Sequence, residues 1–198
     1  MNLPADEWPA ERVRAWTAAL DALAAAGEAA GAATAEQDLL EGTANALTGH
    51  FADWVIVDVS PSRQASRWVA GRGDEPGLAT AVAGLPVDGC PMIVSAMEQR
   101  TPLVQAAMAD PAELGVLPDG RRVAEAFGAA SCAVSPIMAG EGAIGSITIV
   151  RGDSQRRVTF LELNVLAHIA DLTAAAIERL SGPASRPGPR RQDVPNTH

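Results

Sequence analysis

Three glycines, Gly140, Gly142 and Gly145, have the G-x-G-x-x-G spacing that binds a pyrophosphate in dinucleotide-binding folds. In those folds the glycines follow a strand and open a helix, and an acidic residue for the ribose comes about 20 residues later. Here the next residues are SITIV, a β-branched run without a helix-opening residue. We therefore expect the glycines to form a β-hairpin turn, with Gly145 at a bulge or a close backbone approach, and no phosphate site.

The two cysteines, Cys90 and Cys132, do not have the spacing of metal ligands. They form no C-x-x-C pair and have no neighbouring histidine, which excludes the common zinc motifs. A disulfide is unusual in the cytoplasm, so both are predicted to be buried small hydrophobic residues. The histidines, His50, His168 and His198, are predicted to be solvated or helix-capping rather than haem ligands.

Other side chains that often take part in catalysis lack suitable partners. Asp53 and Asp58 lie near the ends of one predicted strand, where carboxylates are usually solvated, and no acid–base partner is evident. Ser131 and Ser135 have no histidine that the expected topology brings near. The pair Arg121–Arg122 is predicted to lie on the surface rather than to bind an anion. These residues therefore predict a protein that is not an enzyme.

The composition narrows the class of protein further. A chain of 198 residues, 47% of them hydrophobic, fits one globular domain with flanking segments. The net charge of −9 argues against nucleic-acid binding, which needs a basic face. No apolar run approaches the roughly 20 residues of a membrane span, and the N-terminus lacks the pattern of a secretion signal. We expect a cytoplasmic protein with neither a membrane nor a nucleic acid as partner.

Hydrophobic periodicity predicts helices at both ends of the chain. The first covers about residues 9–30, and a second runs to about Leu47. One face of the first helix has an apolar row that suits packing against another helix: Val13, Trp16, Leu20 and Leu23. The terminal helix begins at a capping box of Thr159 and Glu162 and ends after Leu180. Residues 182–198 have the composition of a disordered tail.

Strand patterns lie between these helices. FADWVIVDVS predicts a central strand, residues 66–70 an antiparallel partner, and the runs on both sides of GEGAIG a hairpin. Residues 78–122 are short mixed segments, with one helix predicted over 92–98, and such an irregular insert is usually a lid or a binding wall. The order predicts an α+β fold: an antiparallel sheet with the terminal helices on one face and the insert over the other.

Several segments together resemble a GAF domain, a sensory relative of the PAS fold. They are FADWVIVDV, MEQRTPLV after the middle helix, SCAVSPIMAGEGAIGSITIVRG, and the helix ending LAHIADLTAAAIERL. The resemblance predicts three parts: an N-terminal helix, a candidate for dimerisation (1–34), the GAF domain (35–181), and the tail (182–198). The segments look closest to GAF domains of actinobacterial signalling proteins, which often accompany a phosphatase or a histidine kinase.

The resemblance implies a non-catalytic sensory or regulatory module, but it identifies no cofactor or ligand, because GAF domains differ in what they bind. Cyclic-nucleotide binders carry an N-K-F-D-E signature, and this chain has no lysine. The Asp-Ile-Pro and Cys-His steps of bilin binders are absent as well. A branch of the family reduces free methionine sulfoxide with pocket cysteines; Cys90 matches one of them, but the others have no counterpart, so this activity is only a remote alternative.

In the geometry of the family a ligand lies between the sheet and the insert. Larger apolar or small polar side chains on those elements are the candidates to line the space: Trp68, Cys90, Met92, Val94, Met108, Phe127, Val134 and Ser135. The alternative for the same residues is an ordinary core. A second alternative needs no ligand, because the terminal helices are expected to form a homodimer and to contact a signalling partner such as a kinase or phosphatase.

Overall fold

A five-stranded antiparallel sheet forms the centre of the protein, with spatial order β2-β1-β5-β4-β3. Its strands are β1 (Trp54–Val59), β2 (Ser66–Gly71), β3 (Leu103–Gln105), β4 (Ser131–Ala139) and β5 (Gly142–Arg151). The computed structural model describes residues 10–50, 52–59, 66–72, 77–152 and 157–182. The predicted disordered tail, apart from Gly182, and the turn between β1 and β2 lie outside these ranges.

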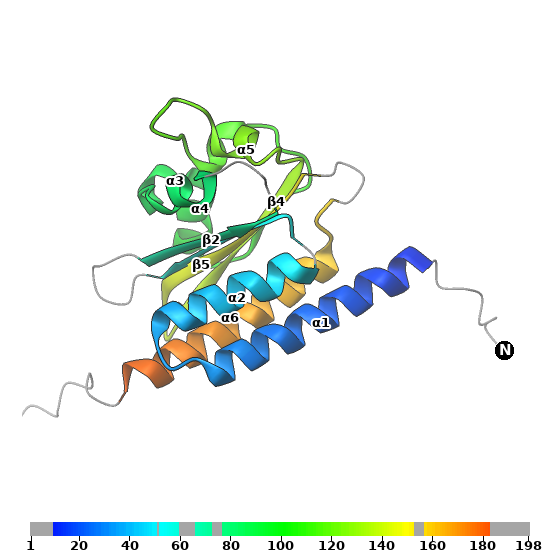
Figure 1. Cartoon of the computed structure of the whole chain (residues 1–198), viewed down its shortest axis with the longest axis vertical. Helices are drawn as coiled ribbons and strands as arrows, with labels where there is room; N and C mark the ends of the chain where they lie inside the picture. The colour runs from blue at the N-terminus through cyan, green and yellow to red at the C-terminus, as the bar shows by residue number, and fades with distance from the viewer. Residues whose placement is uncertain (1–9, 51, 60–65, 73–76, 153–156, 183–198) are drawn as a thin grey trace, which may run out of the picture.

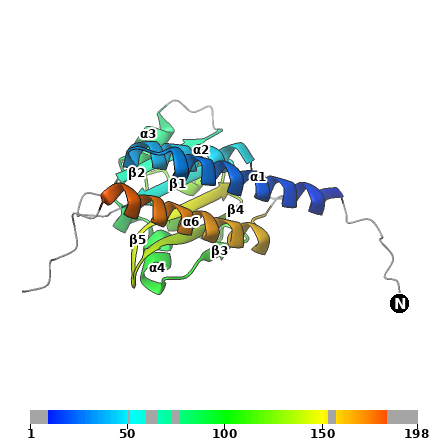
Figure 2. The same ribbon diagram turned by 90° about the horizontal axis from the view of Figure 1, so that it is seen from below.

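Helices cover the two faces of the sheet in the predicted arrangement (Figures 1 and 2). On one face lie α1 (Ala10–Ala32), α2 (Glu36–His50) and α6 (Phe160–Ser181). The insert on the other face contains α3 (Leu78–Ala83), η1 (Val87–Gly89), α4 (Pro91–Gln99), η2 (Pro111–Leu114) and α5 (Val123–Ala126). The predicted α+β fold is therefore confirmed.

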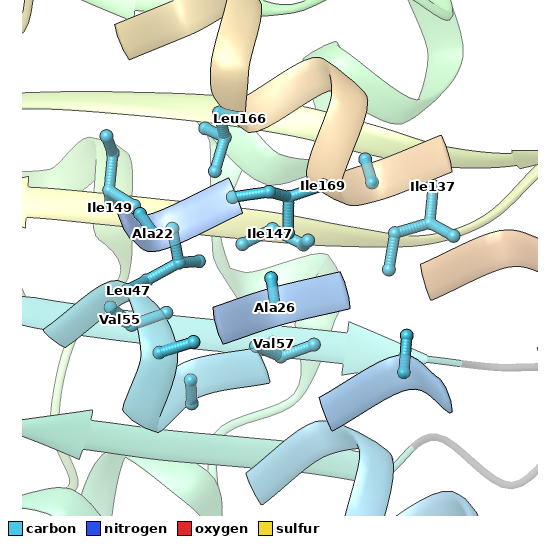
Figure 3. Close-up of a cluster of buried hydrophobic side chains, with 14 of the residues drawn as sticks. Ala22, Ala26, Leu47, Val55, Val57, Ile137, Ile147, Ile149, Leu166 and Ile169 are labelled. Carbon is cyan, nitrogen blue, oxygen red and sulfur yellow. The ribbon is translucent and has the colours of Figure 1, made fainter. Parts of the chain in front are cut away.

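The helix-facing side of the sheet packs into a continuous hydrophobic core (Figure 3). Val55 and Val57 of β1 contribute from the sheet, and Leu166 and Ile169 from α6. In α1 the buried side chains are alanines, whereas the predicted apolar row of larger residues points outward: Val13 is 50%, Trp16 44% and Leu20 58% exposed, and Leu23 is half-buried. The apolar row of Val13, Trp16 and Leu20 therefore contributes little to the packing of α1 on the other helices of this chain.

Small residues let the three helices approach closely. A Cβ atom at Gly42 of α2 would lie 2.8 Å from the Cβ of Ala29 in α1. At the far end of α6, the Arg179 guanidinium donates to the carbonyl oxygens of Ala30 (2.7 Å) and Ala33 (3.1 Å), which satisfies carbonyls at the C-terminal end of α1. These hydrogen bonds thus hold α6 to α1, in addition to the packing of the helix layer on the sheet.

The terminal helix begins at the capping box that the sequence predicts. The Thr159 side chain accepts from the backbone N–H of Glu162, and Glu162 accepts from the backbone N–H of Thr159. The same carboxylate is buried in an ion pair with Arg151 at the end of β5. By length and composition, α6 is apolar enough to cross a membrane, which the sequence pattern did not indicate, but half of that window is buried here within the core.

The GEGAIG segment forms the predicted hairpin turn between β4 and β5, and a strand rather than a helix follows it. Gly140 has φ +58°, and the strand register shifts between Ile137, which pairs with Gly145, and Met138, which pairs with Ala143. A Cβ atom at Gly145 would lie 2.1 Å from the carbonyl oxygen of Asp58 on β1. Glycine is therefore required at this position because the β1 backbone passes too close for a side chain.

Gly145→Ala is expected to lower the free energy of unfolding by about 1–3 kcal/mol, because β1 and β5 must separate locally to admit the methyl group. Urea unfolding measures this change. The control is Gly142→Ala in the same strand, where an added Cβ meets no atom within 4 Å, and its effect should stay below about 0.5 kcal/mol. Equal effects of the two substitutions would contradict the argument.

Candidate functional site

The strand register arranges the insert-facing side chains in three rows across the sheet. The row nearest the β4–β5 turn is Arg67, Asp58, Ser146 and Pro136; the middle row is Val69, Ile56, Thr148, Val134 and Leu103; the last row is Gly71, Trp54, Val150, Cys132 and Gln105. The last two rows are largely apolar and pack against the insert. The first row is largely polar, so the chemistry of this face is concentrated at one end of the sheet.

A buried ion pair joins the first two members of that row. The Arg67 Nε atom donates to Asp58 Oδ1 at 2.5 Å, and an Arg67 NH2 group donates to Asp58 Oδ2 at 3.2 Å. Each side chain is 3% exposed. Ser146 also donates to Asp58 Oδ2, at 3.4 Å. The pairing is bidentate, which is the strongest geometry available to an arginine and a carboxylate.

The Arg67 guanidinium also reaches the insert. Its Nη1 atom donates to the carbonyl oxygens of Leu85 (3.1 Å) and Val82 (3.4 Å), which lie after and within α3. The Cys90 sulfur lies 3.7 and 3.8 Å from the two terminal nitrogens, and itself donates to the Leu114 carbonyl oxygen at 3.3 Å. One side chain from β2 therefore connects β1 with the C-terminal end of α3 and with Cys90, which follows η1.

Burial dominates the proton affinities of these groups. It raises the pKa of Asp58 above its usual value, and the hydrogen bond and charge of Arg67 offset only part of the rise. Burial also raises the pKa of the Cys90 thiol, again with partial offset by Arg67. Burial raises the pKa of the Cys132 thiol to about 12. Both thiols are therefore protonated at neutral pH and weak nucleophiles.

A pocket of about 330 Å³ opens beside the ion pair. We call it the α4 pocket, because η1 and α4 form one wall and the ends of β1 and β5 form the other. Its lining residues are Asp58, Val59, Val87, Asp88, Val94, Met97, Glu98 and Gly145. Most of the lining is apolar, and the polar side chains among these described residues are three carboxylates, of which Asp88 and Glu98 are exposed. The volume falls within the range of small-molecule sites, about 300–1,000 Å³.

The eight predicted lining residues separate into three groups. Val94 lines the α4 pocket. Five others pack on the insert side of the sheet, in the hydrophobic core that fills the centre of this face: Cys90, Met92, Met108, Phe127 and Val134. For these five, the alternative of an ordinary core describes their positions in this structure. The Phe127 ring, for example, stacks on Trp54 with ring centroids 4.3 Å apart.

The predicted placement of Trp68 and Ser135 over the insert face is wrong. Trp68 packs against the helix-side core, because it alternates with Arg67 and Val69, which face the insert. Ser135 is buried between two neighbours of the helix-side core, Ala133 and Ile137, and therefore points the same way. Strand periodicity alone could have placed both side chains, had the inward face been assigned correctly.

The expectation that Asp58 is a solvated carboxylate without a partner is also wrong, since it is buried and ion-paired. A signal for this was present in the sequence, because the β1–β2 hairpin register sets Asp58 directly opposite Arg67. The other predicted acid, Asp53, accepts a hydrogen bond from the Gly152 backbone N–H at 2.9 Å. Among the described residues, no cluster of three potential metal ligands occurs.

Comparison with protein families now identifies the class of protein. The family model for the GAF domain matches residues 11–177, and the chain therefore belongs to the GAF domain family. The match includes the sheet and most of α1 and α6. The comparison with curated proteins finds no significant match.

Solved structures share this fold at low sequence identity. The GAF domain of a phosphoenolpyruvate-protein phosphotransferase from Coxiella burnetii is 15% identical, with a TM-score of 0.63 over 86% of this chain and 98% of the other. Residues 122 to 287 of a methyl-accepting chemotaxis protein are 17% identical, with a TM-score of 0.63 over 79% and 96%. Free methionine-R-sulfoxide reductase from Neisseria meningitidis, in complex with its substrate, is 17% identical, with a TM-score of 0.62 over 82% and 90%.

Arg67→Met is expected to lower the free energy of unfolding by about 3–5 kcal/mol, because it leaves the Asp58 carboxylate buried without its counter-charge. Combining it with Asp58→Asn should recover much of the loss, since no lone charge then remains. Arg122→Met is the control, because its ion pair with Glu125 is about half exposed and should contribute less than about 1 kcal/mol. Urea unfolding of the native chain and the three variants measures these changes. An Arg67→Met effect as small as that of Arg122→Met would refute the role of the ion pair.

Proposed function

We propose that this GAF domain is a non-catalytic sensory or regulatory module that binds a small molecule in the α4 pocket and signals through its terminal helices. The observation that carries the proposal is the pocket itself, which lies between the sheet and the insert. It is concave, mostly apolar and bordered by a few polar groups, which are the usual properties of small-molecule sites.

A route from the pocket to the helices runs through Val59 at the end of β1. Val59 lines the α4 pocket and is also buried in the core shared with α1, α2 and α6. Well-packed interiors transmit displacements, because they hold few voids that can absorb them. A ligand that moves Val59 would therefore press on the helix layer. In this proposal the module is cytoplasmic and acts on a kinase or phosphatase, as in the actinobacterial signalling proteins that its sequence resembles.

The absence of catalysis is part of the same proposal. Both thiols are buried, with pKa values raised by burial, unlike the thiolates that cysteine-based reductases use. The Asp58 carboxylate is held by Arg67 and is therefore poorly placed to transfer protons. A methionine sulfoxide reductase activity needs a reactive thiolate, so in this proposal the chain lacks that activity.

Val94→Phe is expected to fill the α4 pocket and abolish small-molecule binding there. Screening a library of polar metabolites by thermal shift should find compounds that raise the melting temperature of the native chain, and Val94→Phe should respond at least tenfold more weakly to them. Val104→Phe on β3 is the control, since this valine is 38% exposed and does not line the pocket. Compounds that stabilise all three proteins equally would place the binding site elsewhere and sink the proposal.

We also propose that the module is a homodimer through α1 and α6. The exposed row of Val13, Trp16 and Leu20 favours this, because three large apolar side chains on one helix face are rarely left in water. The row continues into a groove lined by Leu23 of α1 and by His168, Asp171 and Leu172 of α6. The N-terminal part of α1 extends beyond the rest of the helix layer, where a second copy has room to pack (Figures 1 and 2). A second copy offers the same apolar row, as a symmetric dimer interface requires.

The double substitution Trp16→Glu/Leu20→Glu is expected to convert the dimer to a monomer, because it puts two charges into each half of the apolar contact. Light scattering after gel filtration measures the mass over a range of protein concentrations. Val116→Glu is the matched control, because this valine is 48% exposed on the insert and away from α1. A native chain that is monomeric at high micromolar concentration would refute the dimer, while the α4 pocket proposal would stand.

A further inference from the structure

We infer that the α4 pocket selects a small organic cation: a primary ammonium group attached to a compact apolar body. The inference rests on the function proposed above, since it names the chemical class of the molecule that the module would bind. Its basis is the distribution of charge around the pocket, together with the apolar surface between the charged groups.

Among the described residues, the polar side chains that line the pocket are all carboxylates, which accept hydrogen bonds when ionised. Asp58 lies at the sheet end, and Asp88 and Glu98 lie on η1 and α4. No basic side chain is among the described residues that line the pocket. An anionic molecule would meet two exposed carboxylates without a compensating charge, whereas a cation would be attracted by them.

The basic residue that is paired with Asp58 is already occupied. The Arg67 guanidinium donates to Asp58 and to the carbonyls of Leu85 and Val82, and its side chain is 3% exposed. It cannot turn to an anion in the pocket without leaving the Asp58 carboxylate buried and unpaired, which is costly. The polar row therefore offers acceptors rather than donors to a bound molecule.

The apolar lining determines the rest of the molecule. The apolar side chains on the η1–α4 wall are aliphatic or thioether groups, Val87, Val94 and Met97. Quaternary ammonium ligands are usually held by aromatic cages, and no aromatic side chain is among these lining residues. A primary ammonium has three N–H donors and suits carboxylates instead. The pocket volume of about 330 Å³ limits the body to a single ring or a short alkyl chain.

The test uses three probes with one aromatic ring and different charge: benzylamine, benzyl alcohol and benzoate. Binding to the full chain is measured by titration, following the backbone amide NMR signals of α4. We expect benzylamine to bind about tenfold more tightly than benzyl alcohol, which corresponds to one charge-assisted hydrogen bond, and benzoate not to bind measurably. Raising the salt concentration should weaken benzylamine and leave benzyl alcohol unchanged, because Asp88 and Glu98 are exposed to solvent.

Glu98→Gln separates a charge effect from a structural one. It should weaken benzylamine several-fold and leave benzyl alcohol unchanged, whereas a mere disturbance of α4 would weaken both. Glu41→Gln is the control, because it removes the same charge from an exposed site on α2, across the sheet from the pocket.

Two kinds of result would overturn the cation inference. Equal or tighter binding of benzoate, or an unchanged benzylamine affinity in Glu98→Gln, would overturn the cation inference while α4 signals still report a working small-molecule pocket. Absence of any α4 shift with all three probes would also overturn the cation inference. In that case the metabolite screen with Val94→Phe decides by itself whether the pocket binds other molecules.

Discussion

The buried ion pair between Arg67 and Asp58 is the interaction on which the insert side of this domain depends. Two charges that are each 3% exposed are tolerated only when nearly every hydrogen-bonding position is satisfied. Asp58 therefore requires Ser146 on β5, and Arg67 requires the carbonyls of Leu85 and Val82 in the insert. Meeting these requirements fixes the register of the β1–β2 hairpin and holds the α3–η1 segment over one end of the sheet.

The α4 pocket follows from that constraint. Large apolar side chains fill the middle and far rows of the insert face, where Trp54 and Phe127 stack, so that little space is left there. At the end with the ion pair, Gly145 has no side chain because the Asp58 carbonyl lies against it. Gly145 therefore contributes only backbone to the wall of the pocket beside the buried carboxylate, and η1 and α4 form the opposite wall. The pocket therefore lies at the end of the insert face where a polar ion pair stands in place of the large apolar side chains that fill the rest of this face.

Local chemistry made much of the fold predictable from the sequence. Capping at Thr159 and Glu162, and β-branched runs around the GEGAIG turn, depend on residues close in the chain. The errors concerned relations between distant segments. Trp68 and Ser135 were assigned to the wrong face, and Asp58 was predicted to be solvated, because its partner comes from the neighbouring strand. In the site, Val94 was predicted to line the pocket, whereas the carboxylates Asp88 and Glu98 were missed, since their common orientation depends on how η1 and α4 lie against the sheet.

The helix layer shows why large apolar side chains of α1 are left outside. Contacts among α1, α2 and α6 use alanines and glycines, such as Ala29 against Gly42, and such surfaces allow short interhelical distances that bulky residues would prevent. The larger Val13, Trp16 and Leu20 are then left on the outer face. Closely packed helices held by Arg179 have few alternative arrangements, so a displacement at Val59 would move them together rather than deform one of them. A partner helix that packs on Val13, Trp16 and Leu20 would then change its angle relative to α1. In this way a molecule bound in the small pocket would influence a distant effector protein.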